Sequence, residues 1–231
     1  MKTGIGILLF AILMIGSALQ AQDCTMYFPE NIGSEREMRH YDQRDRLSAI
    51  TRHEILDKVT NGNNTKVKVR ATSYDEDETE IYSSDLELYC EDGVFRFDLK
   101  DYLDPATLAT YEEMGIEFTA DNLIYPASLN AGDQLPDGEI KMVVKSGAAT
   151  ILTMTVNISN RKVEEMEDIT TDAGTFSCYK ISYDINSKAG FINTSSSAVE
   201  WIADGVGMVR NETFNRRGKL TGYTVLTNFK N

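Results

Sequence analysis

The side chains best suited to acid–base or metal chemistry in this sequence are His40 and His53, its only two histidines. They stand 13 residues apart, on the first two strands that we expect, with a turn between them. Across such a hairpin they could face each other, but no thiolate or carboxylate motif accompanies them at the spacing of a metal site. We therefore interpret both as polar strand positions, and we predict neither a bound metal nor a cofactor.

Acidic residues gather in two short runs that resemble calcium-binding or catalytic sites. Residues 75–80 lack the sixth-position glycine and the distant bidentate glutamate of an EF-hand, so we expect a solvated hairpin tip. A catalytic serine would need a strained turn such as Gly-x-Ser-x-Gly, and the sequence contains none. The second run could supply a carboxylate pair, although an exposed charged strand explains it equally well; it comprises Glu164, Glu165, Glu167 and Asp168. We expect no enzymatic activity.

The composition restricts the partners of the protein. The 231 residues include 36 acidic and 23 basic side chains, which gives a formal charge of -13. Such a balance opposes non-specific binding to nucleic acid or to anionic membrane surfaces. We expect no nucleic-acid partner, and instead an apolar small molecule or another envelope protein.

The first 21 residues are typical of a secretory signal peptide. Lys2 precedes an apolar run from Ile5 to Ile15, which is too short to span a membrane, and no stop-transfer segment follows it. Small residues then lead to a plausible cleavage point between Ala21 and Gln22. We therefore predict a signal peptide over 1–21, no integral membrane span, and a single β-rich domain over 22–231 in the periplasm or another exported location.

Three cysteines would meet an oxidising compartment after export: Cys24, Cys90 and Cys178. The residues before Cys24 lack the small residue that lipid attachment requires, so we expect an unlipidated protein. Sequence alone permits three pairings. We favour a disulfide between Cys24, on an otherwise untethered mature N-terminus, and Cys90, at the end of a predicted strand. Cys178 would then be an inert core thiol.

Period-two alternation of polar and apolar residues dominates the rest of the chain and predicts β-strands. The alternating runs lie at 66–71, 80–90, 139–145, 150–159, 175–185, 198–203 and 219–229. Short glycine-containing turns separate them, as at Asp92-Gly93 and Arg217-Gly218, which favours hairpins between neighbouring strands. The predicted fold class is mainly β, a curved antiparallel meander sheet or an open barrel.

One short helix is predicted to lie across the sheet. Asp104 can cap it, Pro105 suits its first turn, and Gly115 can end it. Its apolar side chains would face the sheet and form a lid over any ligand; they are Leu108, Tyr111 and Met114.

Several segments, taken in order, resemble a known family. They are Tyr125-Pro126, Leu129 to Gly138, Asn160 to Val163, Thr170 to Ile181 and Glu200 to Arg210. In that order and spacing they resemble the TapB-like family, exported β-rich proteins of unknown function from gram-negative bacteria. The resemblance covers nearly all of the mature chain. It implies a β fold and an envelope location, and it brings no catalytic residues.

The last of these segments has a physical interpretation of its own. Alternation places Trp201 on the same side as Val199 and Ala203, where a large ring could plug one end of a curved sheet. Gly205 and Gly207 then allow a tight turn that a Cβ would strain. We interpret this segment as a structural motif.

Three functions remain open at this stage. The first is a non-catalytic envelope protein that binds an apolar or envelope-derived ligand in the concave side of its sheet. The second is an interaction or scaffold protein whose core is filled by its own side chains. The third, which the sequence favours least, is an envelope enzyme.

Overall fold

The computed structural model describes residues 25–98, 114, 116–146 and 149–231. They form thirteen strands: β1 (Glu35–Asp42), β2 (Leu47–Asn61), β3 (Asn64–Tyr74), β4 (Glu80–Glu91), β5 (Val94–Asp98), β6 (Ile116–Ala120), β7 (Asn122–Pro126), β8 (Gly138–Ser146), β9 (Ala149–Thr171), β10 (Gly174–Ala189), β11 (Ile192–Ala203), β12 (Gly207–Asn215) and β13 (Leu220–Lys230).

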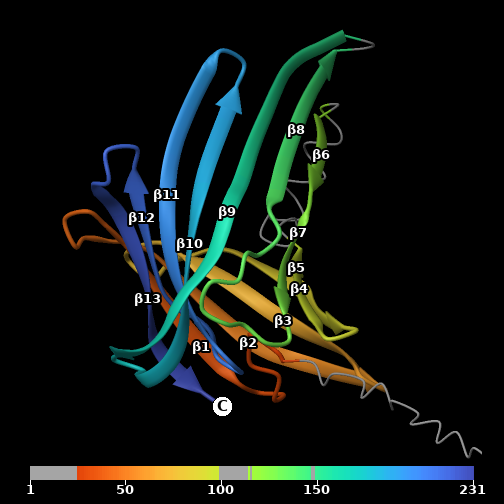
Figure 1. Ribbon diagram of the computed structural model, residues 1–231, viewed down its shortest axis with the longest axis vertical. Helices are drawn as coiled ribbons and strands as arrows, with labels where there is room; N and C mark the ends of the chain where they lie inside the picture. The colour runs from red at the N-terminus through yellow and green to blue at the C-terminus, as the bar shows by residue number, and fades with distance from the viewer. Residues whose placement is uncertain (1–24, 99–113, 115, 147–148) are drawn as a thin grey trace, which may run out of the picture.

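All thirteen strands belong to one antiparallel sheet, in the order β6-β8-β9-β10-β11-β12-β13-β1-β2-β3-β4-β5-β7. Most neighbours in the sheet are also neighbours in sequence, and the last strand, β13, pairs with the first, β1. The sheet is strongly curved, and the upper ends of β8 to β11 extend beyond the other strands (Figure 1). The curved meander expected from the alternation is confirmed, and each predicted strand run lies in or at the edge of a strand.

One stretch of chain forms both edges of the sheet. β6 pairs with β8 and β7 pairs with β5, and only Asp121 separates the two strands. The Asp121 amide donates to the carbonyl of Glu139 at 2.8 Å, and the Asp121 carboxylate accepts from the Glu139 amide at 3.2 Å. Because β6 and β7 are not paired with each other, the segment spans the gap between the edges without closing the sheet into a barrel.

The predicted helix between Asp104 and Gly115 lies outside the described residues, apart from Met114. Across the described ranges the structure contains no helix, and therefore none long and apolar enough to cross a membrane.

The inner face of the sheet carries the main hydrophobic core, and the N-terminal segment lies inside it. Met26, Tyr27 and Phe28 are all buried. The ring of Tyr27 contacts Phe95 and Tyr125, with centroid distances of 6.1 and 5.8 Å. The expectation that the mature N-terminus is untethered is therefore wrong from residue 25 onward, because aromatic side chains with no strand periodicity fill the interior.

A second cluster surrounds Trp201, which packs in one group with Val199 and Ala203 as the alternation predicts. The indole nitrogen of Trp201 donates to Glu167 at 2.7 Å. Cys178 is a buried free thiol in the same cluster, as expected, and burial raises its pKa to about 12.

Candidate functional site

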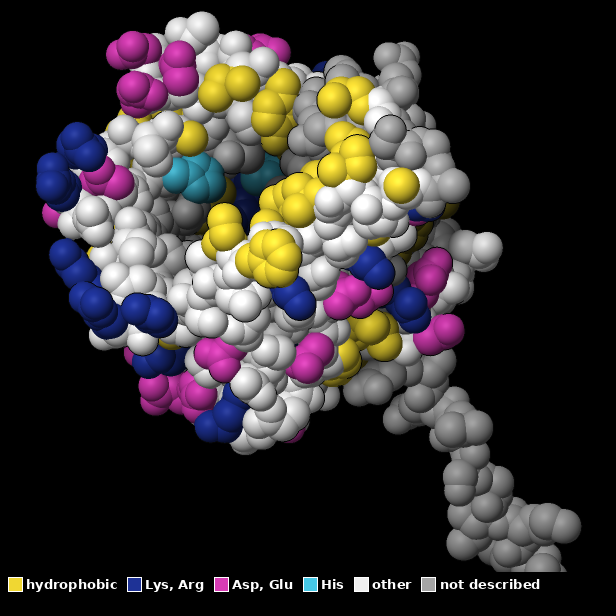
Figure 2. Space-filling view, turned by 90° about the horizontal axis from the view of Figure 1, so that it is seen from above, with side chains coloured by type: hydrophobic (Ala, Val, Ile, Leu, Met, Phe, Trp, Pro, Cys, Tyr) yellow, Lys and Arg dark blue, Asp and Glu magenta, His cyan; other side chains and the backbone are white. Residues whose placement is uncertain are grey.

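A hollow of about 160 Å³ opens on the inner face of the curved sheet. Seen from above, it is open, with apolar side chains around its mouth and histidine in its wall (Figure 2). Its apolar wall combines the N-terminal segment with β1, β5, β7, β11 and β12, through Tyr27, Phe28, Met38, Phe95, Phe97, Leu123, Tyr125, Ile202 and Met208. Five further side chains bring polar atoms into this wall, and they lie on β1, β2 and β11: Arg36, His40, Thr51, His53 and Glu200. An apolar pocket with a few convergent polar groups is the typical form of a small-molecule site.

Arg36 is a buried cation in this wall, with only 4% of its surface exposed. Its guanidinium donates to the carbonyl of Met208 at 2.5 Å and lies 4.9 Å from the ring centroid of Phe28. The approach to β12 is possible because position 207 is glycine: a Cβ there would overlap the guanidinium. Gly207 also has φ +89°, a conformation that side chains disfavour. The segment that we interpreted as a structural motif therefore leaves space, at Gly207, for the buried guanidinium of Arg36.

His53 lies opposite Arg36 in the β1–β2 ladder and is also buried. Burial, with the nearby charge of Arg36 and the proximity of His40, lowers the pKa of His53 to about 3, so the imidazole is neutral near pH 7. Its Nδ1 is buried and has no hydrogen-bond partner among the described residues. A buried polar atom without a partner is costly and is relieved by a ligand or water that bonds to it.

The environment of His40 differs from that of His53. His40 lies on the same face of β1 as Arg36. Its Nδ1 lies 2.9 Å from the hydroxyl of Thr224 and its Nε2 lies 2.9 Å from the hydroxyl of Thr51. Burial lowers its pKa. Both ring nitrogens thus connect neighbouring strands, which is the polar strand role expected from the sequence.

Glu200 is a buried carboxyl group in the wall of the hollow. The Tyr125 hydroxyl donates to it at 2.9 Å. Burial raises the pKa of Glu200, while the positive charge of Arg161 and the Tyr125 hydrogen bond oppose that rise. Arg161 is itself buried, donates to the carbonyl of Pro136 at 2.8 Å and lies 4.7 Å from the Tyr125 ring centroid. A further hydrogen bond from Arg161 to the carbonyl of Ile124 completes contacts that connect β7, β9 and β11 around the Glu200 carboxyl group.

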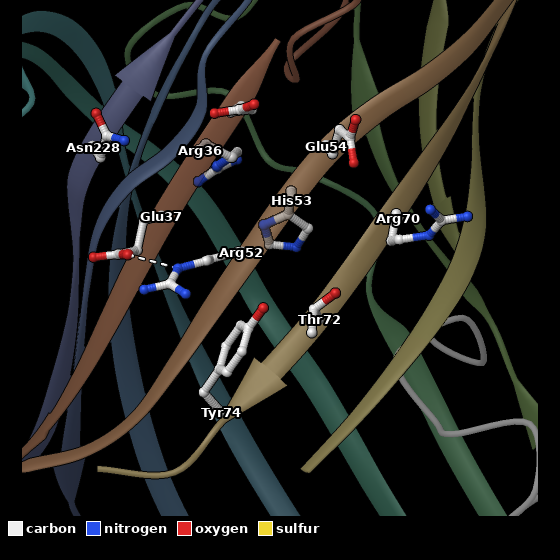
Figure 3. Close-up of a pocket in the computed structure, with 10 residues that line it drawn as sticks. Arg36, Glu37, Arg52, His53, Glu54, Arg70, Thr72, Tyr74 and Asn228 are labelled. Carbon is white, nitrogen blue, oxygen red and sulfur yellow. Dashed lines mark hydrogen bonds and ion pairs between the residues drawn. The ribbon is translucent and has the colours of Figure 1, made fainter. Parts of the chain in front are cut away.

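A polar depression of about 270 Å³ is lined by side chains of β1, β2, β3 and β13 (Figure 3). Its charges are largely paired: Glu37 accepts from Arg39 and from Arg52, each at 2.9 Å, and Arg52 also bonds to Glu78 at 2.9 Å. Paired and partly exposed ions leave little charge for a ligand to neutralise. We therefore regard the inner hollow as the stronger candidate.

The residues predicted as a lid are only partly described. Leu108 and Tyr111 lie outside the described residues, and Met114 has 63% of its surface exposed and does not line the hollow. Of the acidic run at residues 75–80, residues 75–79 form the turn between β3 and β4 and Glu80 begins β4; in this turn the Asp75 carboxylate accepts from the Asp77 and Thr79 amides. Among the described residues, no group of three or more histidine, cysteine or acidic side chains could hold a metal ion.

The acids at residues 164–168 pair with basic or polar neighbours instead of forming a catalytic dyad. Glu164 accepts from Lys162 at 2.6 Å and from Ser182 at 2.6 Å. Glu165 accepts from Lys180 at 3.1 Å.

Sequence reasoning treated His53 as an ordinary position and missed Arg36 and Glu200, since charged residues on alternating strands usually face solvent. The one available signal was the even spacing of Arg36 with Met38 and His40, which places all three on one face.

These features define a class of protein: an open, curled antiparallel sheet with a central hollow that is largely apolar. The chain belongs to the DUF3108-like family, whose model matches residues 31–226. No curated protein matches it.

Two solved structures share the fold. One is a protein from Bacteroides fragilis NCTC 9343, proposed to be exported and described with a YmcC-like fold; it is 24% identical, with a TM-score of 0.73. The other is from Parabacteroides distasonis ATCC 8503 and is proposed to be a lipoprotein; it is 26% identical, with a TM-score of 0.74. Each similarity covers 90% of this chain and 100% of the other chain.

Proposed function

We propose that this protein is a non-catalytic, exported binding protein that holds an apolar ligand in the hollow of its sheet. The single observation that carries the proposal is the 160 Å³ hollow, walled mainly by aromatic and aliphatic side chains. Export is supported by the signal-like N-terminus and by the descriptions of the two structural neighbours. The narrower resemblance to TapB-like proteins, and the lid formed by Leu108, Tyr111 and Met114, stay predictions.

The volume of the hollow limits how much of a ligand it can bury. Apolar cavities of about 150 Å³ accept a molecule the size of benzene, whereas sites for drug-sized ligands occupy roughly 300–1,000 Å³. The hollow therefore suits a ring or a short length of acyl chain, and the remainder of a larger ligand would follow the inner face toward the mouth.

The polar groups in the wall suit a ligand with one polar end. The unpartnered Nδ1 of His53 offers one hydrogen bond, as a donor or an acceptor according to the tautomer. The Glu200 carboxyl group offers a further polar contact. The ligand class that fits both features is an amphipathic molecule with an apolar body and a single polar group.

Binding of the neutral fluorophore N-phenyl-1-naphthylamine tests the proposal. The wild-type protein should bind it, and Met208→Trp, which fills the hollow, should weaken binding at least tenfold. The matched control is Met166→Trp, because Met166 is 57% exposed and lies outside the hollow. Circular dichroism and thermal unfolding establish that both variants are folded.

Failure of the wild-type protein to bind any apolar probe would favour the second function, a scaffold whose core is filled by its own side chains. Mass spectrometry of molecules that co-purify from the native envelope would identify the ligand, or an envelope-protein partner.

A further inference from the structure

The far ends of β9 to β11 carry apolar side chains that nothing in the described structure covers. Phe191, in the β10–β11 turn, is fully exposed, and Ile192 and Ile151 have 70% and 66% of their surface exposed. Together with the adjoining end of β8, these ends extend beyond the rest of the sheet (Figure 1). Large exposed apolar side chains gathered at one end of a protein commonly mark an interaction site.

The exposed end continues the apolar inner face. Met142, Met154, Ala189 and Ile192 are paired in register across β8, β9, β10 and β11, so they form one row on one face of the sheet. In β10, Ala189 and Ile181 are an even number of residues apart, so their side chains point to the same face of the strand. Ile181 is buried in the main core. The row therefore lies on the concave side, and apolar side chains surround the mouth of the hollow in the view from above (Figure 2).

The charge at this end differs from that of the whole chain. Residues 140–163 and 185–199 contain no acidic side chain, although the protein carries a net charge of -13. The tips include Lys145 and Lys188, and Lys145 pairs with Glu117 of β6. At the same end of the sheet, the β12–β13 turn adds exposed basic residues: Arg216, Arg217 and Lys219. The acidic β3–β4 turn also lies at this end, on strands that are five and six positions away from β11 in the sheet.

We propose that this end of the sheet docks on a phospholipid membrane surface, with Phe191 and Ile192 inserted among the lipid headgroups. Exposed aromatic and aliphatic side chains favour the membrane interface, and nearby lysine and arginine side chains favour anionic headgroups. A projecting hairpin tip is convex and therefore suits a fluid lipid surface, whereas a protein partner would need a matching pocket. Docking in this orientation places the mouth of the hollow against the lipid, from which an apolar ligand could enter.

Sedimentation with vesicles tests the proposal, using the processed protein after mass spectrometry has established its first residue. The vesicles contain phosphatidylethanolamine and phosphatidylglycerol in a 3:1 ratio. The double variant Phe191→Ser/Ile192→Ser should lower the partition coefficient at least tenfold. The matched control, Ile32→Ser/Val59→Ser, replaces two exposed apolar residues at the opposite end of the sheet and should change it less than twofold.

A second measurement reports insertion directly. Tryptophan emission of Phe191→Trp should shift to the blue on addition of vesicles, whereas the emission of Ile32→Trp should not change. Absence of wild-type binding to vesicles would overturn the proposal, as would equal losses in the tip and control variants. A dimer that depends on Phe191 and forms without lipid would assign the surface to self-association instead. The tip variant should still bind N-phenyl-1-naphthylamine, so that failure of docking and failure of ligand binding are distinguished.

Discussion

The guanidinium of Arg36 packs directly against Gly207, and a Cβ at position 207 would overlap it and lie 3.2 Å from the ring of Phe28. This contact joins the first strand to the first residue of β12, and the two residues are 171 positions apart in sequence. The contact explains why glycine stands at a position that also has a positive φ, and it fixes the charged end of the hollow.

Substitution of Gly207 should therefore destabilise the protein more than substitution of Gly205. Gly207→Ala adds both backbone strain and a clash, and we expect a loss of about 2–4 kcal/mol in the free energy of unfolding. Gly205 has φ +66° but no atom within 4 Å of its Cβ position, so Gly205→Ala should cost only about 1 kcal/mol. Urea denaturation measures both, and equal losses would show that Arg36 relaxes at little cost.

Removal of the Tyr125 hydroxyl should leave the buried Glu200 carboxyl group without its donor. We expect Tyr125→Phe to lower the free energy of unfolding by about 1–3 kcal/mol. Tyr223→Phe is the matched control, since the Tyr223 hydroxyl bonds to Asp45 on the surface and its loss should cost under about 0.5 kcal/mol. If chemical denaturation gave the same loss for both variants, Glu200 would not depend on Tyr125.

The lowered pKa of His53 predicts a loss of stability in mild acid. Between the unfolded value near 6.5 and the folded value of about 3, the unfolded chain binds a proton that the folded protein does not. Stability is therefore complete above about pH 6.5 and falls by up to about 1.4 kcal/mol for each pH unit below it. The free energy of unfolding of His53→Gln should change less between pH 7 and pH 5. A parallel pH dependence in both proteins would assign the acid sensitivity to other groups.

The disulfide between Cys24 and Cys90 stays a prediction, because Cys24 lies outside the described residues. The carbonyl oxygen of the adjacent residue, Thr25, lies 3.6 Å from the Cys90 sulfur, which places the chain near the required partner. A bond closing this loop of about 66 residues should stabilise the protein by roughly 4 kcal/mol. Peptide mapping without reduction should find the pair and leave Cys178 free, and a bond to Cys178 would refute the assignment.

Processing is predicted between Ala21 and Gln22, without lipid on Cys24. The short apolar run followed by small residues motivates the cleavage point. Intact-mass analysis of the mature protein should match an unmodified chain that begins at Gln22. A mass increase from acyl groups on a first residue Cys24 would show that the protein is lipidated.

Much of the fold could be predicted from local patterns. The period-two alternation in segments such as 150–159 identifies strands, and turns such as Arg217-Gly218 identify hairpins, because both depend on neighbours in sequence. The same local logic correctly placed Trp201 with Val199 and Ala203, and left Cys178 as a buried thiol.

The hollow and its chemistry depended on the tertiary structure. Tyr27 and Phe28 carry no periodic signal, and only the curvature of the sheet shows that they fill its interior. Arg36 and Glu200 each look like exposed strand residues in sequence, and they become buried because the sheet curls inward around them. Alternation divides residues between two faces, but it cannot decide which face the curl encloses. That choice is made by contacts between segments far apart in the chain, as between Arg36 and Gly207.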